Sequence, residues 1–243
     1  MSHLYKKRDP FLIRTIIRYA GLTISITGLL CLLYILYPFI SWKFYFEPVF
    51  ASNDLETPIP KATVLSKSNM HSLFSSAVDS LSIDYSDAMN WFPHFKPAFE
   101  LKNDPAVITT FNISIPKLRI NYANVSTIDT DLSKHLILYP GTSIPPETGN
   151  SVIFGHSTIP TWFNPHDYKT IFGTVHTLKA GDKIVATVNT KEYVYIVESI
   201  RVTTPEDMSI FTQDNNGSYL TLLTCTPPGT TWKRLLVKAK LQS

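Results

Sequence analysis

The chain has 243 residues, with 22 Lys and Arg against 19 Asp and Glu, and a formal net charge of +3. Hydrophobic residues make up 44% and charged residues 17%, which excludes a highly charged disordered protein. Two cysteines are too few for a disulfide-rich scaffold, and the absence of a Lys/Arg tract beyond the N-terminus argues against a nucleic-acid partner.

The first predicted element is a membrane-spanning helix. No charged residue occurs from Tyr19 to Ile40, and 22 residues in a helix extend about 33 Å, enough to cross a hydrocarbon core of roughly 30 Å. A cleaved signal peptide is the alternative, but its apolar region usually has only about 7–15 residues. Bases precede the span and Lys43 is almost alone after it, so the N-terminus is expected in the cytoplasm. We therefore predict a cytoplasmic segment (1–18) and an anchor (19–42) of a single-pass cell-membrane protein.

The next region, residues 43–105, is predicted to be an extracytoplasmic stalk. It contains six prolines and no glycine, and eight serines fall between Ser66 and Ser86. Such a composition is typical of a semi-rigid spacer. Apolar residues recur at helical spacing from Met70 to Leu81, which predicts one short amphipathic helix within the stalk.

From residue 106 to residue 243 the pattern changes to short β-rich runs separated by turn signals, which predicts an all-β domain. Leu235, Val237, Ala239 and Leu241 alternate with their neighbours as in a half-buried strand. Seven or eight strands in this length fit a closed barrel or a sandwich. The expected strands are Val107–Ile115, Ile120–Val125, Ser151–Phe154, Lys183–Val188, Glu192–Arg201, Tyr219–Thr224 and Leu235–Leu241.

Three residues of this domain can carry chemistry together. Cys31 lies in the predicted span, so Cys225 is the one cysteine expected outside the membrane. If the last two strands pair as antiparallel neighbours, their eight-residue connection returns Arg234 to the level of Cys225. His156 follows a glycine where another apolar strand ends. A thiol, an imidazole and a guanidinium supply a nucleophile, a proton shuttle and an oxyanion-stabilising group for acyl transfer.

At these residues the sequence resembles the sortase family. Residues 221–225 read T-L-L-T-C, like the sortase signature around its nucleophile, and Arg234 follows before a final strand. Residues 139–142 (Y-P-G-T) and 149–156 (G-N-S-V-I-F-G-H) resemble the segment leading to the sortase histidine. Residues 115–118 and 178–184 resemble the start of the barrel and a later turn and strand. The resemblance covers roughly residues 106–243.

The resemblance implies an eight-stranded sortase-like β-barrel with few short helices and a cysteine transpeptidase of the cell surface. Cys225 would attack a Thr–Gly bond of a Leu-Pro-x-Thr-Gly-like sorting signal, and His156 would protonate the leaving amine. Arg234 would hold the carbonyl or oxyanion, the Thr224 hydroxyl would help to position the substrate, and cationic neighbours would lower the thiol pKa. The implied partners are secreted proteins with C-terminal sorting signals and an amine acceptor on the cell wall or a pilin.

Alternatives to this function remain open. A cysteine peptidase that only hydrolyses has the same residues, and a non-catalytic membrane-tethered β-barrel would use Cys225 for packing alone. No cofactor is expected. Some family members bind Ca²⁺, and Glu206, Asp207 and Asp214 flank a predicted loop, but they lack an ordered ligand pattern and are interpreted as solvated charge.

Overall fold

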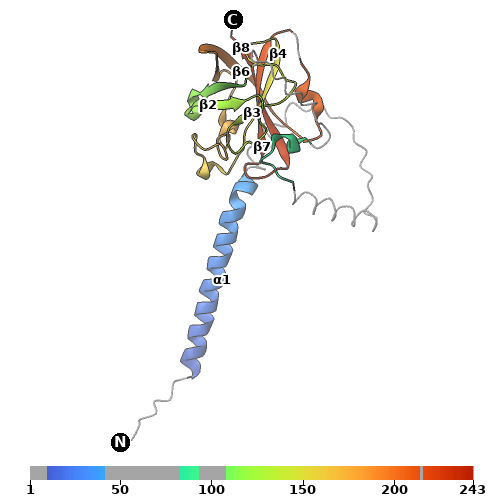
Figure 1. Ribbon diagram of the computed structural model, residues 1–243. Helices are drawn as coiled ribbons and strands as arrows, with labels where there is room; N and C mark the ends of the chain where they lie inside the picture. The colour runs from blue at the N-terminus through green and yellow to red at the C-terminus, as the bar shows by residue number, and fades with distance from the viewer. Residues whose placement is uncertain (1–9, 42–82, 93–107, 214–215, 243) are drawn as a thin grey trace, which may run out of the picture. The chain divides into compact units, whose positions relative to one another are not determined.

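A computed structural model describes residues 10–41, 83–92, 108–213 and 216–242 (Figure 1). The chain divides into two compact units, one comprising residues 1–49 and the other residues 50–243. Within the first unit, α1 (Pro10–Ser41) is a continuous helix. Its stretch Ile17–Tyr37 is long and apolar enough to cross a membrane, and none of it is buried. The amphipathic helix expected over residues 70–81 lies outside the described residues.

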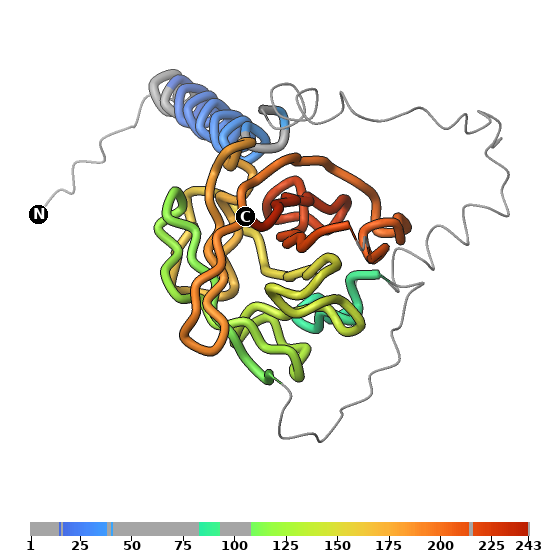
Figure 2. Tube along the Cα trace, turned by 90° about the horizontal axis from the view of Figure 1, so that it is seen from above, coloured from blue at the N-terminus to red at the C-terminus, as the bar shows by residue number. Residues whose placement is uncertain are grey.

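The second unit contains a closed eight-stranded barrel, which confirms the predicted all-β fold (Figures 1 and 2). The strands are connected in the order β1-β2-β3-β4-β7-β8-β6-β5, and β5 closes on β1. Their bounds are β1 Thr110–Ile115, β2 Ile120–Ser126, β3 Leu136–Leu138, β4 Gly149–Phe154, β5 Lys183–Val188, β6 Lys191–Thr203, β7 Ser218–Thr226 and β8 Lys233–Leu241. Short 3-10 helices lie between them: η4 (Pro116–Leu118), η5 (Pro160–Trp162), η6 (Val175–Thr177) and η7 (Met208–Phe211).

Two apolar clusters share the strands, because successive side chains of a strand point to opposite faces. The first cluster fills the barrel with residues from all eight strands, and Leu235, Val237 and Ala239 of β8 belong to it as predicted. The second cluster lies on the outer face of β3, β4, β7 and β8, where Leu236 contributes from β8. Cys225 belongs to this second cluster, so the outer face of the barrel carries the candidate chemistry.

Strand β3 was not predicted. Its residues Leu136–Leu138 are all buried, since Leu136 and Leu138 face the barrel interior while Ile137 belongs to the outer cluster. Burial on both faces removes the alternation by which a strand is normally recognised.

A short segment from the expected stalk packs against the barrel. Residues 83–92 include the 3-10 helix η3 (Ala88–Trp91), and Ala88, Trp91 and Phe92 are fully buried in the outer cluster. In Figure 1 this segment lies beside β7. The part of the chain just before the barrel therefore covers some of its surface.

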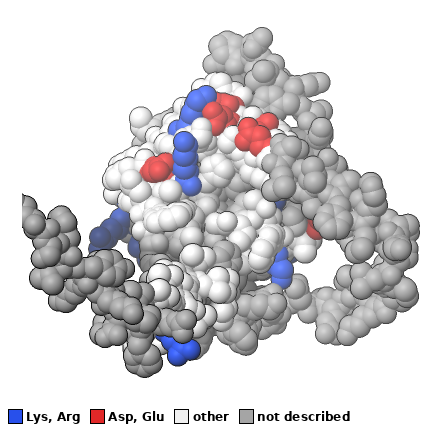
Figure 3. Space-filling view, turned by 90° about the horizontal axis from the view of Figure 1, so that it is seen from below, with Lys and Arg blue, Asp and Glu red and all other residues white. Residues whose placement is uncertain are grey.

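Charged side chains are spread over the face of the molecule shown in Figure 3, where acidic groups lie close to some of the Lys and Arg. Ion pairs among the described residues include Lys117 with Asp182 at 2.7 Å and Lys134 with Asp131 at 2.8 Å. Both pairs are partly exposed, so each contributes little to the stability of the fold.

Candidate active site

The centre of the site is a cross-strand pair, Cys225 on β7 and Arg234 on β8. The two strands are antiparallel, and Cys225 and Arg234 are direct register partners. The turn between Pro227 and Trp232 thus returns the guanidinium to the level of the thiol, as the length of the connection predicts. Both side chains are buried, with 7% of Cys225 and 1% of Arg234 exposed.

His156 reaches the same level from the neighbouring strand. Strand β4 runs parallel to β7 with Phe154 opposite Leu223, and the Gly155 N–H continues this ladder by donating to the Leu223 carbonyl at 3.1 Å. Two residues after Gly155, the Ser157 hydroxyl donates to the Cys225 carbonyl at 2.7 Å. The backbone thereby brings half-buried His156 beside Cys225.

Gly155 is required here because there is no room for a side chain. An added Cβ would lie 2.5 Å from Phe172 and 2.7 Å from Leu136, closer than such contacts normally occur. Both neighbours are buried in the barrel core and cannot easily move aside. Close packing, rather than backbone freedom at the end of a strand, therefore explains the glycine before His156.

Trp91 links the other two polar groups of the site. Its ring centroid is 5.8 Å from that of His156, and the guanidinium carbon of Arg234 lies 5.4 Å from the Trp91 ring. The Trp91 carbonyl also accepts a 2.7 Å hydrogen bond from Nη2 of Arg234. Trp91 was not predicted as a site residue, although a Trp-Phe pair directly after the serine-rich stretch was an available signal.

The segment that carries Trp91 is fixed by backbone hydrogen bonds to the 130–132 stretch. Ala88 donates to the Thr130 carbonyl at 2.9 Å, and Leu132 donates to the Ser86 carbonyl at 2.8 Å. Asp87 accepts from the Met89 N–H at 2.9 Å and so caps η3. These bonds hold residues 86–91 in one position over the outer cluster.

The guanidinium of Arg234 donates three hydrogen bonds to described residues, all of them to main-chain carbonyls. Nη1 donates to Thr231 at 2.9 Å and to Lys233 at 3.2 Å, in addition to the bond from Nη2 to Trp91. Its Nε is buried without a hydrogen-bond partner among the described residues. A buried unpaired donor costs stability, so Nε is available to a carbonyl oxygen that enters the site.

Burial governs the protonation of the site. It raises the pKa of the Cys225 thiol to about 11, and the positive charge of Arg234 opposes this increase only in part. Burial also lowers the pKa of His156, against the smaller effects of Asp131 and Asp84. The expected low thiol pKa is therefore wrong for this conformation, because desolvation exceeds the attraction of the neighbouring cation. At neutral pH both groups are uncharged.

Thr224 lies on the opposite face of β7 from Cys225. It is 2% exposed, and its hydroxyl donates to the Gly155 carbonyl at 2.7 Å. This bond joins β7 to β4 one residue before Cys225 and one before His156. The hydroxyl is thus committed within the fold, and its contact supports an indirect role through the placement of His156.

The loop acids considered for Ca²⁺ have other contacts. Asp207 caps η7, accepts from Thr203 at 2.6 Å and pairs with Arg201 at 3.3 Å, while Asp214 lies outside the described residues. Within residues 10–41, 83–92, 108–213 and 216–242, no three His, Cys, Asp or Glu side chains gather as metal ligands would.

Comparisons with known proteins concern the domain that contains this site. The model of the Sortase domain matches residues 113–242. Sortase A of Streptococcus agalactiae serotype III (strain NEM316) is 35% identical over 74 residues, which are 30% of this chain and 30% of that protein. The match therefore spans less than a third of the curated relative's length.

Two solved structures have a similar fold. Sortase A from Corynebacterium diphtheriae shares 25% sequence identity at a TM-score of 0.51, over 73% of this chain and 86% of its own. Sortase C2 of Group B Streptococcus pilus island 1 shares 24% at a TM-score of 0.51, over 74% and 100% respectively. At such identities the likeness concerns the barrel and its topology.

Proposed function

The chain belongs to the sortase family, and on this premise we propose that it is a membrane-anchored cysteine transpeptidase that joins proteins bearing a sorting signal to an amine. The main observation in support is the register of Cys225 with Arg234, with His156 at the same level just after the end of β4. A nucleophile, an acid–base group and an oxyanion donor from three adjacent strands are the set that acyl transfer through a thioester requires.

The proposed reaction begins when the Cys225 thiol gives its proton to His156 and the sulfur attacks the carbonyl carbon of the threonine in a Leu-Pro-x-Thr-Gly-like signal. Arg234 donates hydrogen bonds to the oxyanion, and His156 delivers a proton to the leaving glycine amine as the C–N bond breaks. The resulting thioester is attacked by the amine of the acceptor, which loses a proton to His156. Cys225 leaves as the thiolate, and a new amide bond has replaced the old one.

Substrate binding in this scheme requires residues 83–92 to move. The Trp91 carbonyl accepts the hydrogen bond from Nη2 of Arg234, and the Trp91 indole contacts both His156 and Arg234. A substrate carbonyl would replace the Trp91 carbonyl on the guanidinium. Thr224 would act through Gly155, keeping His156 at the level of the thiol.

The apolar stretch of α1 supports the anchoring part of the proposal. Bases cluster before this stretch, so the N-terminus would lie in the cytoplasm and the barrel outside the cell. Secreted substrates and envelope amines are accessible on that side. The anchor would thus keep the barrel where both substrates of the reaction occur.

The test uses the full chain in detergent with a Leu-Pro-x-Thr-Gly peptide and triglycine. The expected results are the joined product and a thioester on the chain detected by mass spectrometry. Cys225→Ala should abolish both, and the matched Cys31→Ala variant in α1 should retain them. Free acid that added amine cannot divert would indicate a peptidase, and no product or acyl-enzyme across a panel of sorting motifs would refute the proposal.

A further inference from the structure

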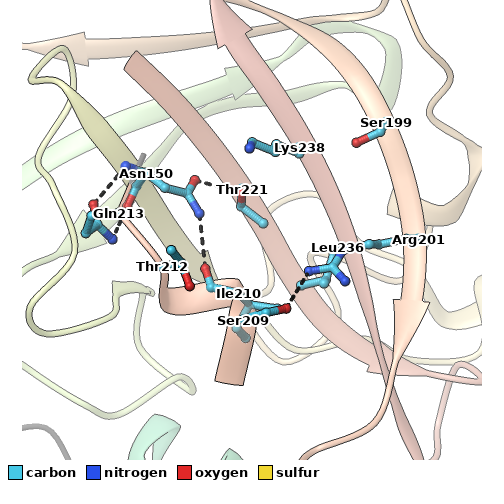
Figure 4. A pocket seen from close by; sticks show the side chains of 10 residues that line it. All are labelled: Asn150, Ser199, Arg201, Ser209, Ile210, Thr212, Gln213, Thr221, Leu236 and Lys238. Carbon is cyan, nitrogen blue, oxygen red and sulfur yellow. Dashed lines mark hydrogen bonds between the residues drawn. The ribbon is translucent and has the colours of Figure 1, made fainter. Parts of the chain in front are cut away.

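A second polar site lies on the same outer face of the barrel. A cavity of about 320 Å³ opens between η7 and strands β6, β7 and β8 (Figure 4). Lys238 and Arg201 line it together with Asn150, Thr221, Ser199 and Ser209. The cavity is therefore mostly polar, in contrast to the apolar cluster around Cys225.

Strand register explains how these polar groups meet. Lys238 on β8 is paired with Thr221 on β7 and with Ser199 on β6, so the three residues form one row across the sheet. Behind Thr221, the buried Asn150 accepts a hydrogen bond from the Thr221 hydroxyl at 2.8 Å and donates one to the Ile210 carbonyl at 3.2 Å. The row thus has a fixed polar floor with a cation at its centre.

The charge of the cavity is positive. The Arg201 guanidinium is paired with Asp207 at 3.3 Å and donates to Ser209 at 3.4 Å. Lys238, in contrast, forms no ion pair with a described residue, and its ammonium lies 4.2 Å from the ring centroid of Tyr219. The charges of Arg201 and Asp207 largely cancel each other. The ammonium of Lys238 is then the net charge that a ligand in the cavity would meet.

The cavity and the thiol share a continuous floor. Thr221 lies four residues before Cys225 on β7, a distance of about 13 Å along an extended strand. Leu236 and Ile210 line the cavity and also belong to the apolar cluster that contains Cys225. The rings of Trp91 and Phe92 lie against Arg234, the register partner of Cys225, so they cover the Cys225 end of this floor. The cavity lies towards Thr221.

We propose that this cavity is a carboxylate-binding subsite for an acidic side chain of the protein substrate. This inference rests on the proposed function. The acyl portion of the substrate must stay bound while the leaving group departs and the acceptor enters, so the floor along β7 and β8 suits the chain before the scissile bond. An extended peptide covers about 13 Å in four residues. A residue four positions before the threonine is the fifth before that bond, directly ahead of the leucine of the signal, and this is where we place the acid.

The experiment compares Leu-Pro-x-Thr-Gly peptides that carry Glu, Gln or Lys at the fifth position and are otherwise identical, using the full chain in detergent. We expect kcat/KM for the Glu peptide to exceed that for the Gln peptide by about tenfold, because charge-assisted hydrogen bonds are stronger than neutral ones. Lys at that position should be the poorest. Added salt should reduce the preference for Glu.

Variants assign the preference to the cavity. Lys238→Gln should bring the Glu-to-Gln ratio close to one, and Lys238→Glu should invert the order in favour of the Lys peptide. Lys240→Gln removes a charge two residues along the same strand without altering the cavity lining and should retain the ratio. A ratio near one in the unchanged chain, or an equal ratio in Lys238→Gln, would overturn the subsite.

Failure of the subsite and failure of the proposed function give different results. If the peptides are processed without preference, only the subsite is wrong. If none is processed, the transpeptidase proposal fails, and the affinity of the Cys225→Ala chain for the Glu and Gln peptides tests the subsite without catalysis. Equal affinities for the two peptides would then reject it.

Discussion

The Trp91 carbonyl accepts a 2.7 Å hydrogen bond from Nη2 of Arg234, which joins the segment before the barrel to the last strand. The same residue places its indole against His156. One residue thus contacts both polar groups that would serve Cys225 in the proposed reaction. The buried thiol and its raised pKa belong to this covered arrangement.

Replacing Trp91 by alanine should make Cys225 reactive. Loss of the indole admits water to the site, so the thiol pKa should fall from about 11 towards the ordinary 9.0, and the thiolate at pH 8 should increase by up to roughly 100-fold. The rate of alkylation by iodoacetamide measures this change in a Cys31→Ala background. Trp162→Ala, which removes a largely exposed indole on η5, is the matched control. Equal rates for the two variants would show that Trp91 does not shield the thiol.

The pH dependence of alkylation follows from the direction of the same shift. A thiol reacts as the thiolate, so a raised pKa moves the reactive range to higher pH. Below its pKa of about 11 the unchanged chain should react about tenfold faster with each unit of pH, with no plateau by pH 10. The Trp91→Ala chain should level off at lower pH. A plateau near pH 8 in the unchanged chain would contradict the burial of the thiol.

The pairing of Cys225 with Arg234 could be predicted because it depends on local features. A strand, a turn of defined length and a second strand with clear alternation determine which residues face each other. The register of β4 with β7 is less local, but the glycine and histidine at the end of an apolar strand still marked the position. Short sequence separation and regular alternation of apolar residues were therefore sufficient to predict these two registers.

The cover over the site could not be predicted in the same way. Trp91 is far from Arg234 in the chain, and its contact depends on how residues 86–88 bond to Thr130 and Leu132. Short 3-10 turns have no periodicity that indicates a partner. The prediction of a low thiol pKa was wrong for a related reason. The sequence indicates the cation beside Cys225, but the depth to which the thiol is buried depends on Trp91 and its neighbours.

Gly155→Ala should displace the end of β4. The added methyl group would meet Phe172 and Leu136 in the barrel core, and overpacking of this kind typically costs about 1–3 kcal/mol. We expect a lower melting temperature and a loss of peptide joining, because His156 moves with the strand end. Adding Phe172→Leu makes room beside the methyl group and should recover part of both. If the single variant keeps its stability, the crowding around Gly155 is not significant.

Arg234→Lys separates the positive charge from the shape of the guanidinium. Lysine preserves the charge near Cys225, but a single ammonium cannot replace the bonds to the Trp91, Thr231 and Lys233 carbonyls and also provide the free donor at Nε. If that donor stabilises the oxyanion, kcat for peptide joining should fall by about 10²–10³-fold with little change in KM. Arg119→Lys, at an exposed position after η4, controls for the substitution itself. A fall in kcat of less than about threefold would mean that the positive charge alone is sufficient. A thermal melt must accompany the assay, because losing the hydrogen bonds to the carbonyls also lowers stability.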